Sequence, residues 1–350
     1  MSSCIINGRF LTQKLTGVHR YAFEMCTALH ESGFKFIVLA PQNVLPEYKF
    51  EFEVIKIGKY NSHFWEQIEL PLYVHMHFRN ALLINFAGLG SLMHSKSICT
   101  IHDLSFLENP SWFSKSYYLF YKFLTPLIAH KAKKIITVSE FSKKEISEKL
   151  RIDNNKIVVI ENAVSPRLLN NFPDNKYNGQ RYLLSVSSID PRKNQLRLIE
   201  AFNLLNENNL KLYVVGKKNK VFGKHSLIEQ ENPNIIFTGY LSDDDLFQIY
   251  RNALAFIYPS LYEGFGIPNL EAMSNACPVI TSNIAPHKEV CGDSALYFDP
   301  ESPTDIADKI KRVVEDKALR RELIEKGKLR ILHFSWHLSA LKLIHVIEII

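Results

Sequence analysis

The sequence lacks the features that mark secreted, disulfide-bonded or membrane-spanning proteins. Its five cysteines, at positions 4, 26, 99, 277 and 291, are scattered along 350 residues and form no Cys-x-x-Cys pair. This spacing excludes a disulfide framework and a clustered cysteine metal site. No apolar run approaches the roughly 18 residues that are needed to span a bilayer. The first ten residues, MSSCIINGRF, contain no basic segment followed by an apolar one, so we expect no signal peptide and a reduced, cytoplasmic compartment.

Apolar residues and basic charge, by contrast, are present in informative amounts. Hydrophobic residues make up 46% of the chain and aromatic residues 12%, which predicts packed globular cores. A length of 350 residues predicts two domains. The net charge of +6 arises in residues 1–170, where 20 Lys and Arg face 14 Asp and Glu, because residues 171–350 hold 22 of each. This excess favours an anionic partner for the first half: a membrane surface, a phosphorylated acceptor or nucleic acid.

Short β-branched runs alternate with helical stretches along the whole chain. Strands are expected at CIIN, FKFIVLA, FEVIKI, ALLINFA, SICTIH, KIITVS, KIVVIE, YLLSVSS, KLYVVG, IIFTGY, LAFIYPS, PVITSN and ALYFDP. Helices are expected near 18–32, 63–77, 193–206, 243–252, 268–276, 302–316 and 317–332. This alternation predicts an α/β fold with two parallel, doubly wound sheets, each covered by helices on both faces. The polar stretch at 170–180 predicts a linker between domains at 1–170 and 171–335, and residues 336–350 are expected to form a helix that packs back toward the first domain.

One loop combines two carboxylates, two glycines and a helix start: PSLYEGFGIPNLEAMSNA, residues 259–276. It follows a predicted strand, and Pro268 suits the first position of the next helix. The backbone N–H groups of Gly264–Gly266 and the helix N-terminus predict an anion site, which glycine allows a ligand to approach closely. Glu263 and Glu271 flank that site, and carboxylates accept hydrogen bonds from vicinal hydroxyls. The pattern describes a nucleotide sugar, with phosphate between ribose and hexose. The alternative is that Glu271 is a first-turn glutamate favoured by the helix dipole.

Three further segments place polar residues directly after predicted strands. DPRKNQLRLIEAF carries Arg192 and Lys193, which could hold a diphosphate and stabilise its charge as it leaves. The alternative for this segment is a solvated basic turn. TIHDLSFLENP carries His102, which could orient a substrate or could be an ordinary surface histidine, since the chain has 13 histidines. TGVHRY, residues 16–21, begins the first helix with Gly17 and predicts either a second anion-binding turn or an ordinary strand–helix turn.

Two further segments carry patterns that suggest a metal site and a membrane-binding helix. SDDDLF, residues 242–247, contains an Asp-x-Asp that could be taken for a metal–diphosphate motif. Because Ser242 is a good helix N-cap and acids suit a first helical turn, we predict a helix start there. Residues 114–134, SKSYYLFYKFLTPLIAHKAKK, interleave aromatic residues with lysines and predict a basic amphipathic helix. Such a helix suits an anionic membrane surface, and the alternative is a core-facing helix with a solvated lysine end.

In chain order, these motifs resemble those of a known family. TGVHRY, IHDLSF, TVSEFSKKEI, VIENAV, DPRKNQLRLIEAF, TGYLSDDDLFQIYRNALAFIYPS, PSLYEGFGIPNLEAM and GDSALYFDP occur in the family's order over nearly the whole chain. Glu263 and Glu271 fit its E-x7-E signature. The chain therefore resembles the retaining GT-B glycosyltransferases of family 4. The resemblance implies two Rossmann-like domains facing across a cleft, with an acceptor-binding domain at 1–170 and a nucleotide-sugar-binding domain at 171–335.

The resemblance also implies roles for the matching residues. Those that hold or polarise the transferred sugar and its leaving group are His102, Glu263, Lys193 and Arg192. Those that contact the donor, with Glu271 on the ribose, are Glu271, Gly264, Phe265, Gly266, Ile267, Gly17 and Ser188. Those assigned to the acceptor are Asp103 and Arg20. Many family members carry Gly-Arg where this chain has Ser187-Ser188, so Arg192 is expected to take over the charge of the missing arginine.

The implied reaction moves a hexose from a nucleoside-diphosphate sugar to an acceptor hydroxyl with retention of configuration, without a metal or other cofactor. The best guess for the donor is GDP-mannose, in the assembly of bacterial surface polysaccharide such as O-antigen or capsule. The expected partners are a saccharide or polyprenyl-diphosphate-linked acceptor and the inner face of the plasma membrane, with no nucleic acid. Two alternatives stay open: a nucleotide-sugar 2-epimerase on the same scaffold, and a non-catalytic sugar-nucleotide-binding partner subunit.

Overall fold

The computed structural model describes residues 4–15, 17–166, 177, 179–188, 190–216 and 232–350. The chain forms two compact units: unit 1 is Met1–Asn162 together with Ser335–Ile350, and unit 2 is Ala163–Phe334. The division follows Asn162, whereas the sequence suggests residue 170. The expected linker at 170–180 lies largely outside the described residues.

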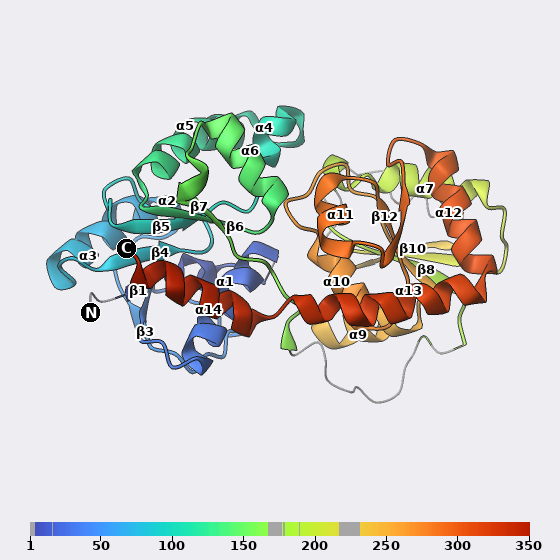
Figure 1. Ribbon diagram of the computed structural model, residues 1–350, viewed down its shortest axis with the longest axis horizontal. Helices are drawn as coiled ribbons and strands as arrows, with labels where there is room; N and C mark the ends of the chain where they lie inside the picture. Colours follow the sequence, from blue (N-terminus) through green and yellow to red (C-terminus); the bar gives the residue numbers. More distant parts are fainter. Residues whose placement is uncertain (1–3, 16, 167–176, 178, 189, 217–231) are drawn as a thin grey trace. The chain divides into compact units, whose positions relative to one another are not determined.

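Unit 1 is built on a parallel seven-stranded sheet with the order β3-β2-β1-β4-β5-β6-β7 (Figure 1). Its strands are β1 (Cys4–Asn7), β2 (Ile37–Ala40), β3 (Val54–Lys56), β4 (Leu82–Asn85), β5 (Ser97–Thr100), β6 (Lys134–Thr137) and β7 (Ile157–Val159). Its helices are η1 (Gly8–Thr12), α1 (Gly17–Glu31), α2 (Ser62–Phe64), η2 (Trp65–Glu69), α3 (Leu70–His77), α4 (Ser105–Glu108), η3 (Pro110–Trp112), α5 (Lys115–Lys131), α6 (Glu140–Leu150), η4 (Asn154–Lys156) and α14 (Trp336–Glu348). The strand order reverses between β1 and β4, which makes the carboxyl ends of these two strands the switch point of the sheet.

The strand register of unit 1 determines which side chains share a face of the sheet. Ile5 pairs with Leu83, and Asn85, two residues further along β4, pairs with Cys99, so these side chains point to one face. Apolar residues of η2, α3, α5 and α6 cover that face. Helices α1 and α14 lie side by side on the opposite face (Figure 1). Trp336 of α14 packs edge-to-face on Tyr21 of α1, with ring centroids 5.5 Å apart.

Unit 2 is built on a parallel six-stranded sheet with the order β10-β9-β8-β11-β12-β13. Its strands are β8 (Tyr182–Val186), β9 (Lys211–Val215), β10 (Ile235–Gly239), β11 (Ala255–Tyr258), β12 (Val279–Ser282) and β13 (Ala295–Phe298). Its helices within the described residues are η6 (Pro191–Lys193), α7 (Gln195–Leu204), α9 (Asp243–Asn252), α10 (Ile267–Ser274), α11 (Ala285–Cys291), α12 (Pro303–Glu315), α13 (Lys317–Arg330) and η8 (Ile331–His333).

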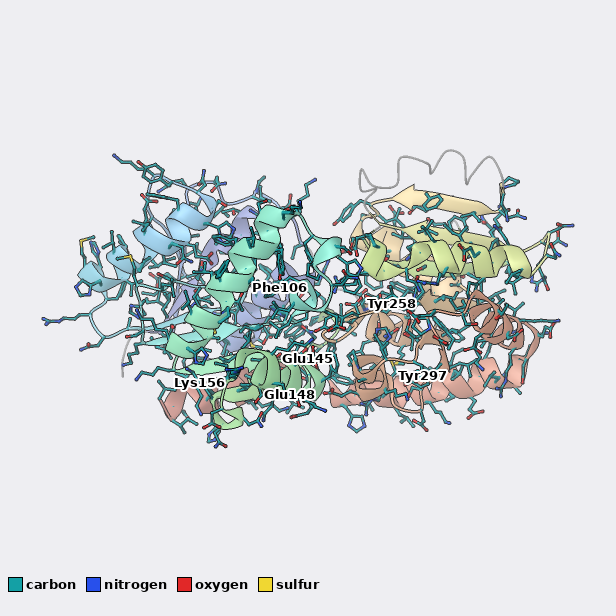
Figure 2. The ribbon with its side chains drawn as sticks, turned by 90° about the horizontal axis from the view of Figure 1, so that it is seen from above. Phe106, Glu145, Glu148, Lys156, Tyr258 and Tyr297 are labelled. Atoms are coloured by element: carbon teal, nitrogen blue, oxygen red, sulfur yellow. The ribbon has the colours of Figure 1, made fainter. Side chains whose placement is uncertain are left out.

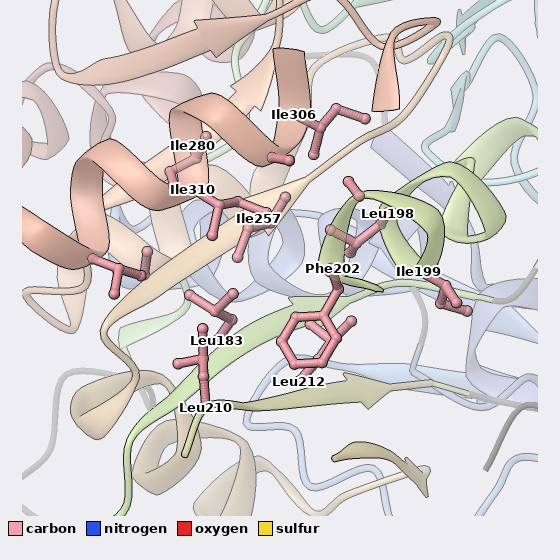
Figure 3. Packing of buried hydrophobic residues seen from close by; sticks show 14 of the residues in the cluster. Leu183, Leu198, Ile199, Phe202, Leu210, Leu212, Ile257, Ile280, Ile306 and Ile310 are labelled. Carbon is pink, nitrogen blue, oxygen red and sulfur yellow. The ribbon is translucent and has the colours of Figure 1, made fainter. Parts of the chain in front are cut away.

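The hydrophobic core of unit 2 lies between one face of this sheet and the helices α7 and α12. Figure 3 shows its members, which include Leu183, Leu212, Ile257, Ile280, Leu198, Phe202, Ile306 and Ile310. Because side chains alternate along a strand, burial of Ile257 in this core directs Tyr258 to the other face of the sheet. The α/β prediction with parallel sheets is confirmed, and every strand expected from the sequence is present. Among the described residues, no helix has both the length and the apolar character that crossing a membrane requires.

The helix expected at 63–77 differs from its prediction, because it is interrupted by the π-helical segment η2. The indole nitrogen of Trp65 donates to the carbonyl of Ile57 at 3.0 Å, and Glu66 accepts from Asn7 at 2.9 Å. Both side chains therefore point into the unit from consecutive positions. A wider π turn accommodates that arrangement, and such turns are frequent at functional sites.

Candidate functional site

In unit 2, hydrogen bonds join the turn that follows β8 to the loop that follows β11, at the carboxyl ends of these two strands. The bonded residues lie 65 or more positions apart in the sequence. Asn194 has a left-handed backbone (φ 56°), and its side-chain amide donates to the carbonyl of Pro259 at 3.0 Å. The backbone N–H of Leu261 donates to the carbonyl of Arg192 at 2.9 Å. The Arg192 guanidinium reaches the carbonyl of Tyr262 at 3.5 Å. These bonds place the basic turn of η6 against the loop that carries Glu263.

The result is a buried cluster of charged and polar side chains, called the basic–acid cluster below: Arg192, Lys193, Tyr258 and Glu263. The Lys193 ammonium is paired with Oε1 of Glu263 and lies 3.1 Å from the hydroxyl of Tyr258. That hydroxyl donates to the same carboxylate oxygen at 2.7 Å, and a guanidinium nitrogen of Arg192 lies 3.6 Å from Oε2. Tyr258, labelled in Figure 2, thus contacts both the cation and the anion at the end of β11.

Burial and charge together set the protonation of this cluster. Burial raises the pKa of the Glu263 carboxyl, but the opposing effect of Lys193 and Arg192 is larger and holds the pKa well below its ordinary value. Burial also lowers the pKa of Lys193, an effect that the Glu263 carboxylate opposes. Burial raises the pKa of Tyr258 well above its ordinary value, so its hydroxyl stays a donor. Glu263 is therefore a carboxylate with cations on both of its oxygens.

The glycine turn after Glu263 leads directly into α10. Gly266 is the N-cap of α10 with φ 91°, and no side chain caps that helix end. A Cβ at Gly266 would lie 2.9 Å from the imidazole of His287 and 3.1 Å from the amide of Asn269, so only glycine fits there. Nε2 of His287 and both amide atoms of Asn269 are buried and make no hydrogen bond within the protein. Three polar atoms without a protein partner beside an uncapped helix N-terminus suit a polar ligand.

The second carboxylate of the E-x7-E pattern has a different environment. Glu271 is buried in α10, and its Oε2 accepts a hydrogen bond from the hydroxyl of Tyr250 at 3.3 Å. Its backbone carbonyl accepts from the side chains of Ser274 and Asn275. Glu271 lies beyond the first turn of α10, so it is not the first-turn glutamate of the alternative interpretation.

Ser188, one of the residues expected at the donor, is exposed and donates to Asp190 at 2.7 Å. The neighbouring Ser187 accepts from Gln195 at 2.9 Å, and its carbonyl would lie 1.8 Å from a Cβ at Gly216. The turn after β8 is thus packed tightly against the end of β9. Phe265 is buried against Phe334, with ring centroids 5.6 Å apart, and Ile267 is half-buried at the start of α10.

The remaining sequence-predicted residues belong to unit 1. Nε2 of His102 lies 2.9 Å from the carbonyl of Phe86, and the ring of Tyr21 packs edge-to-face on the imidazole at 4.9 Å. Burial lowers the pKa of His102, so the imidazole is neutral at pH 7. Oδ1 of Asp103 accepts from the backbone N–H of Ser105 at 2.9 Å. His102 is therefore fixed in orientation by its own unit.

Gly17 and Arg20 lie at the exposed start of α1. A Cβ at Gly17 would have no protein atom within 4 Å, so the position next to this residue is open. Arg20 is half-buried on the first turn of the same helix.

Three site residues escaped the sequence reasoning: Tyr258, Asn269 and His287. Tyr258 ends an apolar strand and carries no polar pattern of its own. His287 lies in NIAPHKEV, which contains nothing to distinguish it from the other 12 histidines. Its Nδ1 is 2.8 Å from the Thr281 hydroxyl, a contact that depends on the pairing of β12 with its neighbours. Asn269 stands two residues before Glu271 at the predicted helix start, and this Asn-x-Glu spacing was the signal that the sequence offered.

The Asp-x-Asp segment forms a helix start, as predicted. The hydroxyl of Ser242 accepts from the backbone N–H of Asp245 at 3.2 Å, and three aspartates occupy the first turn of α9. In the part of the chain that the structure describes, no three His, Cys, Asp or Glu side chains are arranged to hold a metal ion.

Comparisons with known proteins place this geometry in context. The family described as "Glycosyl transferases group 1" matches residues 168–330, and "Glycosyltransferase Family 4" matches residues 15–168. The O-antigen chain mannosyltransferase B of Escherichia coli is 32% identical over 257 residues, which cover 69% of this chain and 67% of that protein. The serotype-specific mannosyltransferase WbdA of E. coli is 31% identical over 264 residues, which cover 69% of this chain but only 32% of that longer protein.

Solved structures agree at the level of the fold. The structure of Anabaena HepE in complex with UDP and glucose superposes with a TM-score of 0.76 at 15% identity, covering 99% of each chain. The folds of both units are thus found in one solved chain of similar length.

Proposed function

Because the chain belongs to the family 4 glycosyltransferases and has the GT-B fold, we propose that unit 2 binds a nucleoside-diphosphate sugar whose hexose is transferred to a saccharide acceptor. One observation carries this assignment. The basic–acid cluster adjoins a glycine turn and an uncapped helix start, where the side-chain amide of Asn269 and Nε2 of His287 have no protein partner. Cations, free amide donors and a helix N-terminus together suit a diphosphate.

The roles within this site follow from charge. Arg192 and Lys193 stabilise the diphosphate as it leaves, because its negative charge grows in the transition state. Glu263, which stays ionised, accepts hydrogen bonds from hexose hydroxyls, and the backbone from Gly264 to Ile267 lies against the phosphate. Glu271 accepts hydrogen bonds from the ribose hydroxyls. Since Lys193 is already paired with Glu263, the incoming diphosphate would share that ammonium with the carboxylate.

The stereochemistry that we propose is retention by front-face substitution. The sugar–phosphate bond breaks, the acceptor oxygen forms its bond on the same face, and the acceptor proton passes to the departing phosphate. The protein positions the reactants and stabilises charge in this scheme. Arg192, Lys193 and the start of α10 supply positive charge where other transferases use a divalent metal, so we propose that no metal is required.

For unit 1 we propose contacts with the transferred sugar and the acceptor. His102 is held in orientation by Phe86 and Tyr21, as a residue that polarises a sugar hydroxyl must be. The open space around Gly17 suits approach by a phosphate or an acceptor group. Asp103 and Arg20 follow on the same segments and are assigned to the acceptor.

For the substrates we propose GDP-mannose as donor and a saccharide, free or linked to polyprenyl diphosphate, as acceptor. Both E. coli relatives are named as mannosyltransferases, which supports a mannosyl donor, and the name of the first supports a role in O-antigen assembly. A bacterial surface polysaccharide is therefore the proposed product. A cytoplasmic location on the inner face of the plasma membrane follows from that pathway.

We further propose that helix α5 attaches the protein to an anionic membrane. Its exposed apolar side chains are Tyr117, Leu119, Phe120, Phe123 and Leu127, and its lysines are Lys115, Lys122 and Lys131. Basic residues beside exposed aromatic ones suit an anionic lipid surface. The protein should sediment with phosphatidylglycerol vesicles and not with phosphatidylcholine vesicles. Phe123→Ser should weaken that binding, whereas Leu204→Ser should not, because Leu204 is an exposed apolar residue (55%) of α7 in unit 2. Equal sedimentation with both vesicle types would remove this part of the proposal.

The donor is tested by a thermal-shift screen of GDP-, UDP- and dTDP-sugars. A ligand that binds only the folded state raises the unfolding temperature. At a ligand concentration of 100 times the dissociation constant, it stabilises the folded state by about 2.7 kcal/mol. We expect a shift with GDP-mannose, and a smaller one in Glu271→Ala. Transfer of labelled mannose to an acceptor glycan then distinguishes a transferase from a binding subunit. No shift with any nucleotide sugar would contradict the proposed function.

A further inference from the structure

In unit 1, the helical segment formed by α2, η2 and α3 exposes a row of apolar side chains. Phe64, Ile68, Leu72 and Met76 follow one another at every fourth position and are 53%, 37%, 42% and 68% exposed. Between the first and the last of them, His75 is the one other exposed residue. These four apolar residues are called the α2–α3 ridge below. A helix at a protein surface normally presents polar side chains to water, so this row indicates a contact surface.

The opposite side of the same segment is buried in unit 1. Trp65, Leu70 and Val74 are fully buried and belong to the hydrophobic cluster that contains Ile5 and Leu83 of the sheet. The segment is therefore apolar on both sides, a pattern that is typical of helices with apolar surroundings all round. Packing in the core explains the inner side only, so the ridge calls for a second apolar environment.

The π-helical segment η2 helps to align the ridge. In a regular α-helix with 3.6 residues per turn, side chains four positions apart drift by about 40° around the axis at each step. The wider π turn of Trp65–Glu69 drifts in the opposite direction, because its hydrogen bonds join residues five positions apart. This compensation agrees with the exposure of both ends of the ridge, Phe64 and Met76.

The exposed charges around the ridge have one sign. In residues 56–80, the exposed side chains that carry a full charge at pH 7 are Lys56, Lys59 and Arg79. The same range contains two carboxylates. Glu66 is buried, and Glu69 accepts hydrogen bonds from two backbone N–H groups of the loop before α2. A basic rim around an apolar row complements an anionic surface with an apolar interior.

Helix α5 contacts the start of this segment. The imidazole of His63 packs on Phe120 of α5 with ring centroids 4.8 Å apart, and on Tyr121 at 6.5 Å. Tyr60 packs edge-to-face on Phe64, with centroids 4.7 Å apart. The sequence of α5 contains no Asp or Glu. The apolar surface with basic neighbours therefore continues from the ridge onto α5.

We propose that the α2–α3 ridge inserts into an anionic lipid leaflet, an inference that rests on the proposed function of a membrane-attached transferase and goes beyond its contact through α5. The ridge side chains enter the acyl region, while Lys59 and Arg79, which flank the segment in sequence, stay at the headgroups. A second copy of the chain fits less well, because a symmetric dimer would place the same basic side chains against each other. Two inserted elements fix the rotation of unit 1 on the membrane, which a single helix does not.

Single cysteines labelled with the polarity-sensitive dye NBD test the insertion, because all five native cysteines are buried. Met76→Cys reports on the ridge, and Phe123→Cys reports on α5. Leu338→Cys is the control, since Leu338 is 50% exposed on α14, which covers the opposite face of the sheet. With phosphatidylglycerol vesicles, we expect NBD emission at position 76 to rise about threefold or more and to be quenched by lipids that carry a doxyl group on the acyl chain. Emission at position 338 should not change.

Leu72→Ser measures the contribution of the ridge to binding. The variant should bind phosphatidylglycerol vesicles about tenfold more weakly in sedimentation, because a leucine side chain no longer enters an apolar environment. Leu338→Ser is the matched control, with an expected affinity within about twofold of the wild type. Both positions are exposed, so both variants should fold as the wild type does.

Vesicle-bound protein whose label at position 76 stays in water would overturn the inference, as would a Leu72→Ser protein with wild-type vesicle binding. A wild-type dimer in sedimentation equilibrium that Leu72→Ser converts to a monomer would assign the ridge to a second copy, and this result also overturns the inference. The α5 contact fails separately, if the label at position 123 stays unquenched while the label at position 76 is quenched. Failure of the proposed transferase function is again distinct, because it appears as absent thermal shifts with nucleotide sugars.

Discussion

Replacing Lys193 by methionine removes the cation that lies closest to the buried Glu263 carboxylate. Removing one partner of a buried ion pair typically costs about 3–5 kcal/mol, because the other charge is left uncompensated. Arg192 stays 3.6 Å from Oε2 and Tyr258 still donates to Oε1, so we expect a loss of about 3 kcal/mol, at the lower end of that range. For a unit of the size of Ala163–Phe334, this corresponds to a fall of roughly 6–12 °C in unfolding temperature.

The pH dependence of this loss has a definite sign. In the wild type, the cations hold the pKa of Glu263 below its ordinary value, so the pair contributes stability above the unfolded pKa and loses it as the pH falls through the folded one. In Lys193→Met, burial raises the pKa of Glu263, and the carboxyl can take up a proton. The difference between variant and wild type should therefore be largest at pH 8 and shrink toward pH 5. Adding Glu263→Gln to Lys193→Met should recover part of the loss.

The assay must report unit 2. Unit 1 contains all three tryptophans, Trp65, Trp112 and Trp336. Indole fluorescence therefore reports the unfolding of unit 1 and not that of unit 2. Amide hydrogen exchange of the peptide that contains β11, together with circular dichroism melting, measures unit 2 directly. Lys326→Met is the control, because Lys326 forms exposed ion pairs with Asp293 and Glu322 on the same unit and should leave the melting temperature unchanged. A Lys193→Met protein that unfolds at the temperature of the Lys326→Met protein would refute the reasoning.

Three further predictions concern the glycine turn, α10 and α11. Gly266→Ala should destabilise unit 2 by about 1–3 kcal/mol in thermal unfolding, because φ is 91° and the new Cβ meets His287; an unchanged melting temperature would argue against this packing. Glu271→Ala should weaken nucleotide-sugar binding at least tenfold in calorimetry while changing kcat less, and an effect on kcat alone would contradict the ribose role. Burial lowers the pKa of His287 to about 4, below the roughly 6.5 of an unfolded histidine, so unit 2 should lose about 3 kcal/mol as the pH falls from 6.5 to 4. His287→Leu should flatten that slope in a melting series, and a persistent slope would assign it to other groups.

The sequence predicted the fold well because its information is local. The short β-branched runs and the N-cap at Ser242 act within a few residues, and parallel strands need helices between them. The same holds for the residues of the glycine loop, since their position after a strand determines which edge of the sheet they occupy. Arg192 and Lys193 were likewise placed at this edge by the strand that precedes them.

The partners of these residues could not be predicted, because they depend on packing between distant segments. Lys193 and Glu263 are 70 residues apart, and their ion pair requires the bonds that Asn194 makes to the neighbouring loop. Tyr258 and His287 join the site from an apolar strand and from an unremarkable helix start. The interruption of the helix expected at 63–77 could not be predicted for a related reason: Trp65 contacts Ile57 and Glu66 contacts Asn7, and both contacts join separate segments.

The most direct measurement of the central claim is a crystal structure of the protein soaked with GDP-mannose. We predict that the diphosphate lies at the glycine turn Gly264–Gly266, with Arg192 and Lys193 within hydrogen-bonding distance of its oxygens and Glu271 at the ribose. A nucleotide bound at another place, with the basic–acid cluster and the amide of Asn269 left without contacts to it, would contradict the account.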